Sequence, residues 1–519
     1  MGGVWNETSG GRPESIRPAA RSRVRLGPAV NRAERLARLL RVLAAIISEP
    51  GLNPLELADR AGVSERTLRR DLVQLRDLGY EVAYTSGYEV QEKLNLEGRS
   101  GRRPRGRGDD ALLQAVAQAV ETAGLWRDTE HVEPVAPRRG KSRRTGIAPI
   151  VLIPTGEDDP DFIYATGFSV ETGLYIRFAD NDDVLVMTPL EVDRARAQSR
   201  VSNIVEDREV YVHRSWARLA ARLLAEKGIT DARVSPNLRA LHFEDLRANG
   251  IEPQVTRDLF VAERRRKSAD EAAAIQEAQR AAETAVVEVV RELAQSEIKD
   301  GILWSNGGPL TSDRLYARAQ LALGERGFTC PSMIVAGSPE CALPHYRGEG
   351  PIKANAPVII DIFPTSRRNH YNGDLTRTVV VGQISEEVRK MHAAVVQALD
   401  AGIESIAPGV QGREPHLNVC QVLVDRGFGT TTKGYEGPDA VAKMNHNTGH
   451  GVGLDVHEQP NLRDAVDDLL AEGDVVTVEP GLYLLGLGGV RVEDTGMVTA
   501  NGFHNFTTLT RSLDPHDYL

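Results

Sequence analysis

The sequence has few cysteines and no long apolar run. Its three cysteines, Cys330, Cys341 and Cys420, form no CxxC pair, so neither a disulfide framework nor a thiolate metal site is indicated. No stretch reaches the roughly 18 apolar residues of a membrane helix. The first 30 residues, rich in Gly, Pro, Ser and Arg, lack an apolar segment of signal-peptide length. These absences predict a cytoplasmic protein with no membrane partner and a disordered tail over residues 1–30.

The charge is unevenly distributed along the chain. Residues 1–145 contain 26 Lys and Arg against 19 Asp and Glu, a net charge of +7, whereas residues 146–519 contain 37 against 54, a net charge of −17. A chain of 519 residues has room for about three or four domains of typical size. The two parts of the chain are therefore expected to differ in kind.

Five residues with metal-binding side chains lie in short apolar or glycine-rich segments near the end of the chain: Asp361, Asp374, His450, Glu479 and Glu493. Four carboxylates gathered in a core would stay buried only by taking up protons, because desolvation and like charge both raise carboxylate pKa values. Two divalent ions would balance the four charges. Oxygen-rich ligation with one imidazole suits Mn, Co, Fe or Zn, and two such ions about 3.5–4 Å apart can activate a shared water. A metal-dependent hydrolase is therefore the first hypothesis.

The segments around these residues form specific motifs. PVIIDIFPTSRRNHYNGDLTRTVVVG (357–382) predicts a strand ending at Asp361, a polar turn and a second strand opened by Asp374. The other motifs are HNTGHGVGLDVHEQP (446–460), VVTVEPGLY with Glu479 and GGVRVEDTG with Glu493. Together they resemble the pita-bread metallopeptidases, the family that includes methionine aminopeptidase, Xaa-Pro aminopeptidase, prolidase and creatinase. The resemblance covers residues 146–519 and implies an α+β pita-bread catalytic domain.

The resemblance also implies roles for the ligands. Asp361 would bind one metal ion, Asp374 and Glu493 would bridge both ions, and His450 and Glu479 would complete the second. The cofactor would be two divalent ions, with Mn the first choice and Co, Zn or Fe as alternatives. Glu479 would additionally transfer the proton of the attacking water.

Four further residues match motif positions of the family. His345, in ECALPHYRGEG, would lie near the leaving nitrogen, and His457 would stabilise the oxyanion. His446 and Arg491 would belong to the substrate pocket. Other histidines are expected to be surface or packing residues, among them His213, His242, His392, His416, His504 and His516. His370 is undecided because it is close to Asp374.

The two aspartates are 13 positions apart, which is two more than in the commonest family pattern. Phe363 replaces the usual glycine, and the turn carries Arg367, Arg368 and His370. Hairpin loops accept insertions more readily than strands do. We therefore expect a variation in pocket shape and not the loss of the metal site.

Residues 31–92 predict a winged helix-turn-helix. Apolar residues from Leu36 to Ile47 are spaced as on a helix, LNPLELADRAGVSERTLRRDLVQLRDLGYEV resembles the DeoR-like winged helix, and GYEVAYTSGYEV predicts a hairpin around Ser86-Gly87. A recognition helix capped by Ser64 would present its first residues to DNA. The candidate contacts are Glu65, Arg66, Thr67, Arg69 and Arg70. The alternatives are a protein-interaction module and a solvated arginine face.

The remaining segments complete the domain plan. Residues 93–145 contain two Arg-rich stretches and predict a basic flexible linker, either adding phosphate contacts or acting only as a tether. Residues 146–263 alternate strand-like and helical runs, and DFIYATGF resembles the α/β lid domain of creatinases and Xaa-Pro peptidases. Ser268 and Glu271 predict a capping box that opens a long helix. The catalytic domain is therefore expected over residues 264–519.

The leading interpretation is a dinuclear peptidase that cleaves before proline, either an Xaa-Pro aminopeptidase or an Xaa-Pro dipeptidase, tethered to DNA or self-regulated through its winged helix. The lid domain disfavours methionine aminopeptidase, and the complete set of acidic ligands disfavours creatinase, which works without metal. The resemblance implies a homodimer that acts on Xaa-Pro peptides. The alternative is a transcription regulator whose pita-bread domain senses a peptide or small molecule without turnover.

Overall fold

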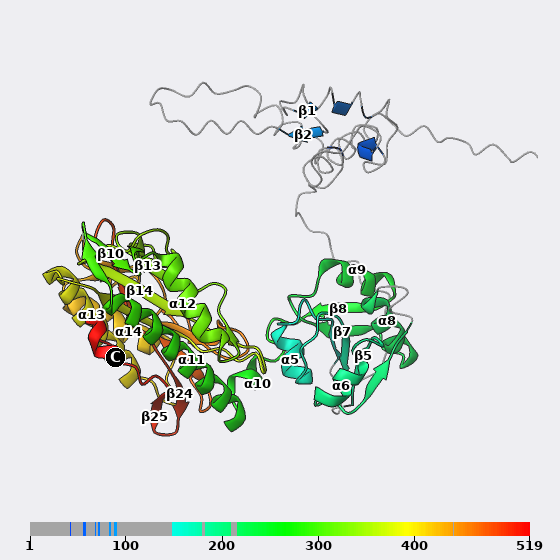
Figure 1. Ribbon diagram of the computed structural model, residues 1–519. Coiled ribbons are helices and arrows are strands. Elements are labelled where there is room, and N and C mark those ends of the chain that lie inside the picture. The colour runs from blue at the N-terminus through cyan, green and yellow to red at the C-terminus, as the bar shows by residue number, and fades with distance from the viewer. Residues whose placement is uncertain are drawn as a thin grey trace, which may run out of the picture. The chain divides into compact units, whose positions relative to one another are not determined.

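The computed structural model describes residues 148–178, 182–208, 215–439 and 441–519, together with short pieces of the first 90 residues (Figure 1). The chain divides into two compact units, Met1–Arg143 and Arg144–Leu519. In the described parts of the chain, no helix combines the length and apolarity needed to cross a bilayer.

The described pieces of the first unit include a hairpin and a few buried apolar residues. β1 (Val82–Tyr84) and β2 (Tyr88–Val90) are antiparallel, with Tyr84 opposite Tyr88, which confirms the predicted hairpin. Leu68 and Leu72 are buried, as their helical spacing predicted. The predicted tail, the predicted linker and the candidate DNA contacts lie outside the described residues; these contacts are Glu65, Arg66, Thr67, Arg69 and Arg70.

The second unit begins with an α/β domain built on one six-stranded sheet. The strand order is β6-β5-β4-β3-β7-β8, with β4 antiparallel to both of its neighbours. The strands are β3 (Ile150–Leu152), β4 (Leu174–Arg177), β5 (Asp183–Met187), β6 (Ile204–Glu206), β7 (Asp231–Val234) and β8 (Glu252–Val255).

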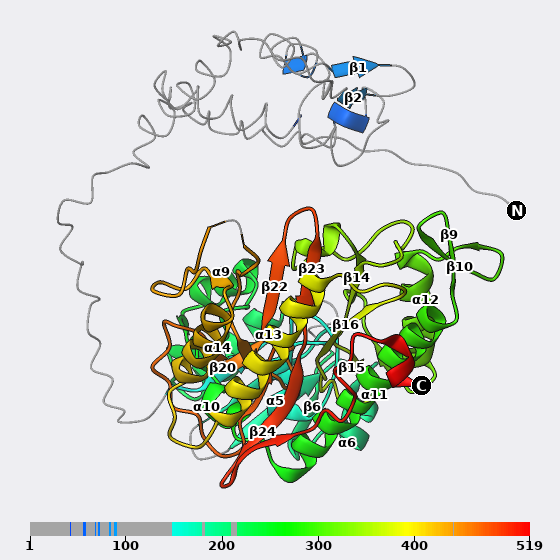
Figure 2. The same cartoon turned by 90° about the vertical axis from the view of Figure 1, so that its left-hand side faces the viewer.

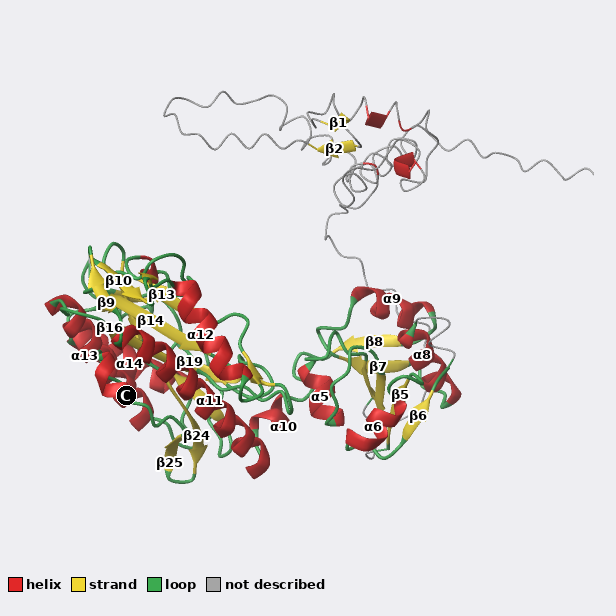
Figure 3. Cartoon of the chain, in the orientation of Figure 1, coloured by secondary structure: helices red, strands yellow, loops and turns green. Residues whose placement is uncertain are grey.

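Alternating residues of these strands enter two separate cores, one on each face of the sheet. Val151 and Ile176 pack with α8 (Trp216–Glu226) and α9 (Ala240–Ala248). Leu152 and Tyr175 pack with α5 (Pro160–Thr166) and α6 (Val192–Gln198). The domain therefore has three layers, with helices on both sides of the sheet (Figure 3).

The long helix α11 (Ala269–Ala294) follows the short α10 (Val261–Arg265) and opens with the predicted capping box. The Ser268 hydroxyl accepts from the Glu271 backbone N–H at 3.3 Å, and the Glu271 carboxylate accepts from the Ser268 backbone N–H at 2.8 Å. Apolar residues along one face of α11 are fully buried. This helix packs against β14 (Pro357–Ile362) and β16 (Leu375–Val380).

The rest of the second unit is an α+β domain with two main cores. The first joins α11 and α12 (Ser312–Gly324) to β13, β14 and β16, and the second joins α13 (Glu386–Glu404) and α14 (Arg413–Asp425) to β21, β22 and β23. Figure 2 shows α13 running beside β22 and β23.

The main sheets of this domain are β13-β14-β16, β20-β19-β21-β24-β25 and β17-β18-β22-β23. Their strands are β13 (Ile334–Gly337), β14 (Pro357–Ile362), β16 (Leu375–Val380), β17 (Gly429–Thr430), β18 (Lys443–Met444), β19 (Gly449–Gly451), β20 (Glu458–Leu462), β21 (Val475–Val478), β22 (Gly481–Leu484), β23 (Gly488–Arg491), β24 (Asp494–Thr499) and β25 (Gly502–Asn505). Smaller elements are β9 (Glu297–Lys299), β10 (Ile302–Ser305), β11 (Gly308–Pro309), β12 (Phe328–Thr329), β15 (Thr365–Ser366) and the 3-10 turns η2 (Glu340–Ala342) and η3 (Pro515–Tyr518).

Candidate metal centre and active site

Asp361 and Asp374 lie at the same end of a buried hairpin. β14 and β16 are antiparallel, with Asp361 opposite Thr376 and Ile362 opposite Leu375. Asp374 lies immediately before β16. Burial, followed by the negative charge of Asp361, raises the pKa of Asp374 well above its usual value. The hairpin predicted from the sequence is present. It brings the two carboxylates close enough for the charge of Asp361 to raise the pKa of Asp374.

The longer turn between the two aspartates is ordered. Its strand β15 pairs with β12, and the Thr365 hydroxyl donates to Asn372 Oδ1 at 2.6 Å. His370 adopts a left-handed conformation with φ 62°. Phe363, which replaces the usual glycine, packs against the first core. The extra residues are therefore contained within the turn, and the two acids remain on neighbouring strands.

His450 lies in the middle of β19, between two glycines that have no space for a side chain. A Cβ at Gly449 would lie 2.0 Å from the Thr477 carbonyl oxygen, and one at Gly451 would lie 2.4 Å from that of Gln459. The His450 Nδ1 lies 3.2 Å from the Gly451 carbonyl, which can only accept, so Nδ1 carries the proton and Nε2 has a free lone pair. Burial lowers the pKa of His450 to about 4, so the ring is neutral.

Glu479 and Glu493 reach the same region from the ends of β21 and β23. The Glu479 backbone N–H donates to the Thr448 carbonyl at 2.7 Å, which ties it to the segment that carries His450. Glu493 Oε2 accepts from the Thr376 hydroxyl at 2.9 Å. Among the described residues, the buried Glu493 Oε1 has no hydrogen-bond partner. A buried carboxylate oxygen without a partner is costly, and a cation would satisfy it.

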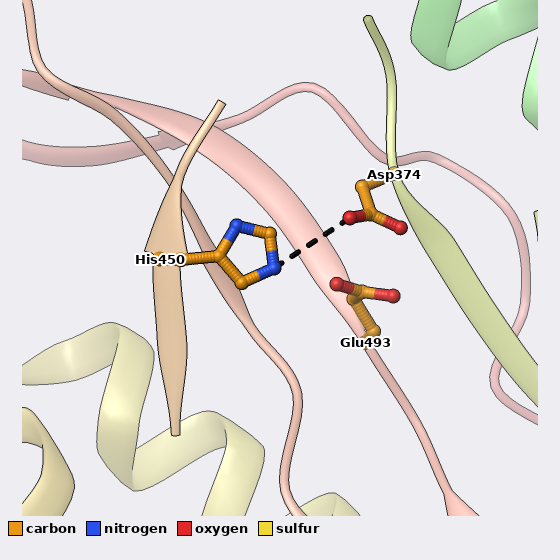
Figure 4. A group of neighbouring side chains, drawn as sticks. All are labelled: Asp374, His450 and Glu493. Atoms are coloured by element: carbon orange, nitrogen blue, oxygen red, sulfur yellow. Dashed lines mark ion pairs between the residues drawn. The ribbon is translucent and has the colours of Figure 1, made fainter. Parts of the chain in front are cut away.

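The side chains of Asp374, His450 and Glu493 point toward one another (Figure 4), and their ligand atoms all lie within 4.8 Å of each other. His450 Nε2 is 3.6 Å from Asp374 Oδ2 and 3.5 Å from Glu479 Oε1. The charge of Asp361 contributes to the raised pKa values of Asp374, Glu479 and Glu493. The structure thus brings Asp374, His450 and Glu493 together, with Glu479 beside His450, and Asp361 is near enough for its charge to act on the other acids.

Comparison with known protein families agrees with this arrangement. Residues 273–500 match the model of metallopeptidase family M24, and residues 151–249 match the creatinase/prolidase N-terminal domain. The chain carries a metallopeptidase domain of family M24. Residues 38–89 match an HTH domain. The α+β fold expected from the motifs is therefore the pita-bread fold, preceded by a creatinase-type lid domain and a helix-turn-helix domain.

Individual relatives and a solved structure support the assignment. An Xaa-Pro dipeptidase of Pyrococcus horikoshii is 28% identical over 360 residues, which cover 68% of this chain and 92% of the relative. One of Pyrococcus furiosus is 35% identical over 181 residues, which cover 35% of this chain and 48% of the relative. The crystal structure of the prolidase from Pyrococcus horikoshii OT3 matches with a TM-score of 0.59 and 26% identity, covering 71% of this chain and 95% of the other.

The acids of the M24 domain suit divalent cations. Burial raises the pKa of Glu479 to about 8, and burial followed by the charge of Asp374 raises that of Glu493 well above its usual range. Without cations these groups would have to hold protons, because like charges this close disfavour full ionisation. Carboxylate oxygens with one neutral imidazole form a donor set typical of hard and borderline ions. The unpartnered Glu493 Oε1 fits the same interpretation.

Three histidines surround the M24 ligand cluster. The ring centroids of His450 and His457 are 4.3 Å apart. The charge of His345 contributes to lowering the pKa values of both His446 and His457. His345 and His457 are exposed, whereas His446 is mostly buried. His345 and His457 are therefore open to solvent, and His457 is also in contact with the candidate ligand His450.

Arg491 is buried and contacts a candidate ligand directly. Its Nη2 donates to Asp361 Oδ2 at 2.6 Å, and its Nη1 donates to the Tyr483 hydroxyl at 2.8 Å. His446 Nδ1 lies 2.8 Å from the Asn447 carbonyl, so His446 Nε2 accepts from the Tyr483 hydroxyl at 2.9 Å. Through Tyr483, Arg491 thus connects His446, a candidate pocket residue, to Asp361, a candidate metal ligand. Direct contact of Arg491 with substrate stays a prediction.

The sequence interpretation missed several residues that support the ligands. Tyr483 lies within the motif already recognised around Glu479. Arg377 is a charged residue in the fully buried strand β16, and its own burial is complete. Gln279 lies on the apolar face of α11. For Arg377 and Gln279, the available signal was a polar residue at a position where the pattern predicts an apolar one.

Proposed function

We propose that the M24 domain is a two-metal peptidase that hydrolyses the peptide bond before proline. The observation that carries the proposal is the cluster of Asp374, Glu479 and Glu493 around the unprotonated Nε2 of His450, with an oxygen of Glu493 that has no protein partner among the described residues. The relatives named Xaa-Pro dipeptidase support the substrate class. The proposal includes an aminopeptidase and a dipeptidase as alternatives, which differ in the length of peptide that they cleave.

In this proposal Asp361 would hold one ion, His450 and Glu479 would hold the other, and Asp374 and Glu493 would be shared by both. Mn is the first choice, with Co, Zn and Fe as alternatives. When bound, the ions supply the positive charge that the four acids require and the acidification of water needed for hydrolysis.

Glu479 is the residue best placed to transfer the proton. It is the most exposed of the five candidate ligands, with 21% of its side chain exposed. A carboxylate at the boundary between the metal centre and the pocket can take a proton from water and return it to the leaving amine. The other four ligands are enclosed and suited to holding charge.

The histidines would act on the substrate. His457, next to His450, is placed to donate to the developing oxyanion, and such donors contribute strongly to catalysis. The exposed His345 would contact the leaving nitrogen. The pKa of His446 is lowered to about 3 by burial and by the charge of Arg491, so His446 would contribute to the pocket as a neutral group.

Alanine substitution tests the centre. Asp374→Ala and Glu479→Ala should each lower kcat/KM for an Xaa-Pro dipeptide by at least about 10²–10⁴-fold, because the first removes a ligand and the second also removes the general base. Elemental analysis of the same samples should give two ions per chain in the parent protein and fewer in Asp374→Ala. Asp400→Ala, which removes only a surface ion pair with Arg511, should retain activity. Undiminished cleavage by both active-site variants would refute the proposal.

Peptide length separates the two activities. A dipeptidase should cleave Xaa-Pro and lose activity on Xaa-Pro-Xaa, whereas an aminopeptidase should accept the longer peptides. Turnover of neither set by the metal-loaded protein would favour the alternative of a regulator that senses a ligand.

We further propose that the helix-turn-helix domain binds DNA, with Glu65, Arg66, Thr67, Arg69 and Arg70 as contacts, and that the protein is a homodimer. Binding to the DNA upstream of its own gene should weaken steeply with salt, because phosphate contacts release counterions. Absence of binding at low salt would favour a protein-interaction role. Light scattering of the purified protein tests the dimer.

A further inference from the structure

The main chain of Asp374 is held by a single side chain from α11. The Asp374 backbone N–H donates to Gln279 Oε1 at 2.9 Å, and Gln279 Nε2 donates to the Asp374 carbonyl at 2.8 Å. The Gln279 amide therefore pairs with this residue as a neighbouring strand would. Only one orientation of the amide satisfies both groups, because the N–H needs an acceptor and the carbonyl needs a donor.

Two threonines close a ring of hydrogen bonds around this contact. Gln279 Nε2 also donates to the Thr507 hydroxyl at 2.9 Å, and that hydroxyl accepts from the Thr495 backbone N–H at 3.0 Å. The Thr495 hydroxyl donates to the Asp374 carbonyl at 2.7 Å. Every polar group in the ring has a partner, so the buried arrangement is rigid.

The chain next to Asp374 also lies directly on α11. A Cβ added at Gly373 would be 2.6 Å from the Ala278 carbonyl carbon and 2.7 Å from the Gln279 nitrogen. This backbone contact leaves the Asp374 peptide little freedom to move away from Gln279. The helix thus fixes the point from which the Asp374 carboxylate extends.

Gln279 is completely buried among alanine, valine and isoleucine side chains of the same helix face. An amide in such a stripe is unfavourable unless it is fully hydrogen-bonded. Replacing it by an apolar residue would leave the buried Asp374 backbone N–H without its acceptor, which costs stability. The orientation of the Asp374 main chain also depends on it, because an apolar side chain cannot fix a peptide group.

We propose that Gln279 is a positioning residue of the metal centre: its amide fixes the peptide of Asp374 and thereby the carboxylate shared by the two ions. This inference rests on the proposed function of Asp374 as a bridging ligand. Loosening the peptide lets the carboxylate leave the position in which both ions are bound. Partners of metal ligands typically contribute about 10–100-fold to metal affinity.

Gln279→Met tests the inference because it keeps length and volume but removes both hydrogen bonds with Asp374 and the one to Thr507. Titration of the metal-free protein with Mn²⁺ should show affinity reduced by about 10–100-fold, and the visible absorption spectrum of the Co²⁺-loaded protein should change. Val286→Ala is the matched control, since it removes buried volume from the same helix in the first core. It should lower thermal stability and leave both metal readouts unchanged.

Thr495→Val provides a second variant if Gln279→Met does not fold. It removes one donor to the Asp374 carbonyl and should weaken Mn²⁺ binding by a smaller factor. Parental affinity and an unchanged Co²⁺ spectrum in the folded variants would overturn the inference, as would an equal loss in Val286→Ala. Failure of the parent protein to bind Mn²⁺ would instead count against the proposed function.

Discussion

Each candidate ligand is held by a polar group from another element. Besides the contact of Gln279 with Asp374, the Thr477 hydroxyl accepts from the His450 backbone N–H at 3.2 Å. Arg377 places its guanidinium on backbone carbonyls, including that of Thr376 at 2.9 Å and that of Glu493 at 2.5 Å. Because these supports are buried, they restrict the orientations of the candidate ligands, which favours affinity and precise geometry.

The pH dependence of stability should report the burial of His446. In the folded protein its pKa is about 3, whereas an unfolded histidine titrates near 6.5. The unfolded chain therefore takes up the proton first, so the contribution to stability is complete above about pH 6.5 and is lost as the pH falls toward about 3. Between pH 7.5 and 5.5 the metal-free protein should lose about 1 kcal/mol through this group.

Urea unfolding of His446→Gln at the two pH values measures this contribution. Glutamine reaches the position of Nε2 and can still accept a hydrogen bond from Tyr483 but does not titrate, so the pH dependence of its free energy of unfolding should be shallower than that of the parent. Equal slopes for the two proteins would show that His446 is not kept neutral by the fold.

The ligands could be predicted from the sequence because each lies in a distinctive motif and because four acids require cations. Their supports could not be predicted in the same way. Gln279 and Asp374 are 95 positions apart, and their contact depends on how α11 lies across β16. A single sequence shows that a polar residue interrupts an apolar stripe, but it does not show which group that residue meets.

At the scale of elements, the glycines around His450 allow β19 to approach its neighbours closely. Gly451→Ala would place a methyl group 2.4 Å from the Gln459 carbonyl. We expect the free energy of unfolding to fall by about 1–3 kcal/mol and Mn²⁺ affinity to fall by about tenfold or more, because His450 shifts with its strand. Thermal unfolding and metal titration measure the two effects.

Gly324→Ala is the control for this substitution. Gly324 ends α12, and a Cβ there meets no heavy atom within 4 Å. Alanine at a helical position should be neutral or stabilise by up to about 1 kcal/mol, without change in metal affinity. A Gly451→Ala protein that resembled this control would show that β19 tolerates the added methyl group.

Local elements were predictable where local chemistry decides them. The capping box of Ser268 and Glu271, the hairpin of β14 and β16, and the hairpin of β1 and β2 are each specified by residues close in sequence. The placement of β19 between β20 and β21 was not predicted. It arises from pairing of distant segments, for which alternation of residue type gives no partner.

At the scale of the whole molecule, all the proposed catalytic residues belong to the unit Arg144–Leu519 and the HTH match belongs to Met1–Arg143. A protein consisting of residues 146–519 should therefore keep kcat/KM for an Xaa-Pro peptide within about threefold of the full chain, because separate domains carry their own cores. It should lose binding to DNA. Peptidase assays and DNA titrations on both proteins measure this, and a large loss of peptidase activity would show that the first unit contributes to catalysis.

The sequence indicated the kinds of domain better than their borders. Family matches support the lid, the M24 domain and the HTH domain, while the borders at 31–92, 93–145, 146–263 and 264–519 stay predictions. A border depends on where few contacts cross the chain, and composition marks this only where the residues change in character, as in the Arg-rich stretches of 93–145.

The ordered turn between the two aspartates offers a route for divergence of this enzyme. β14 fixes Asp361 through strand pairing, and Gln279 with the close contact at Gly373 fixes Asp374, so both ends of the turn are anchored independently of its length. Residues 363–372 can therefore lengthen, shorten or exchange side chains while the distance between the two carboxylates is conserved. Arg367, Arg368 and His370 line a cavity, so exchanging these side chains would reshape that cavity while the anchors of the two candidate ligands stay in place.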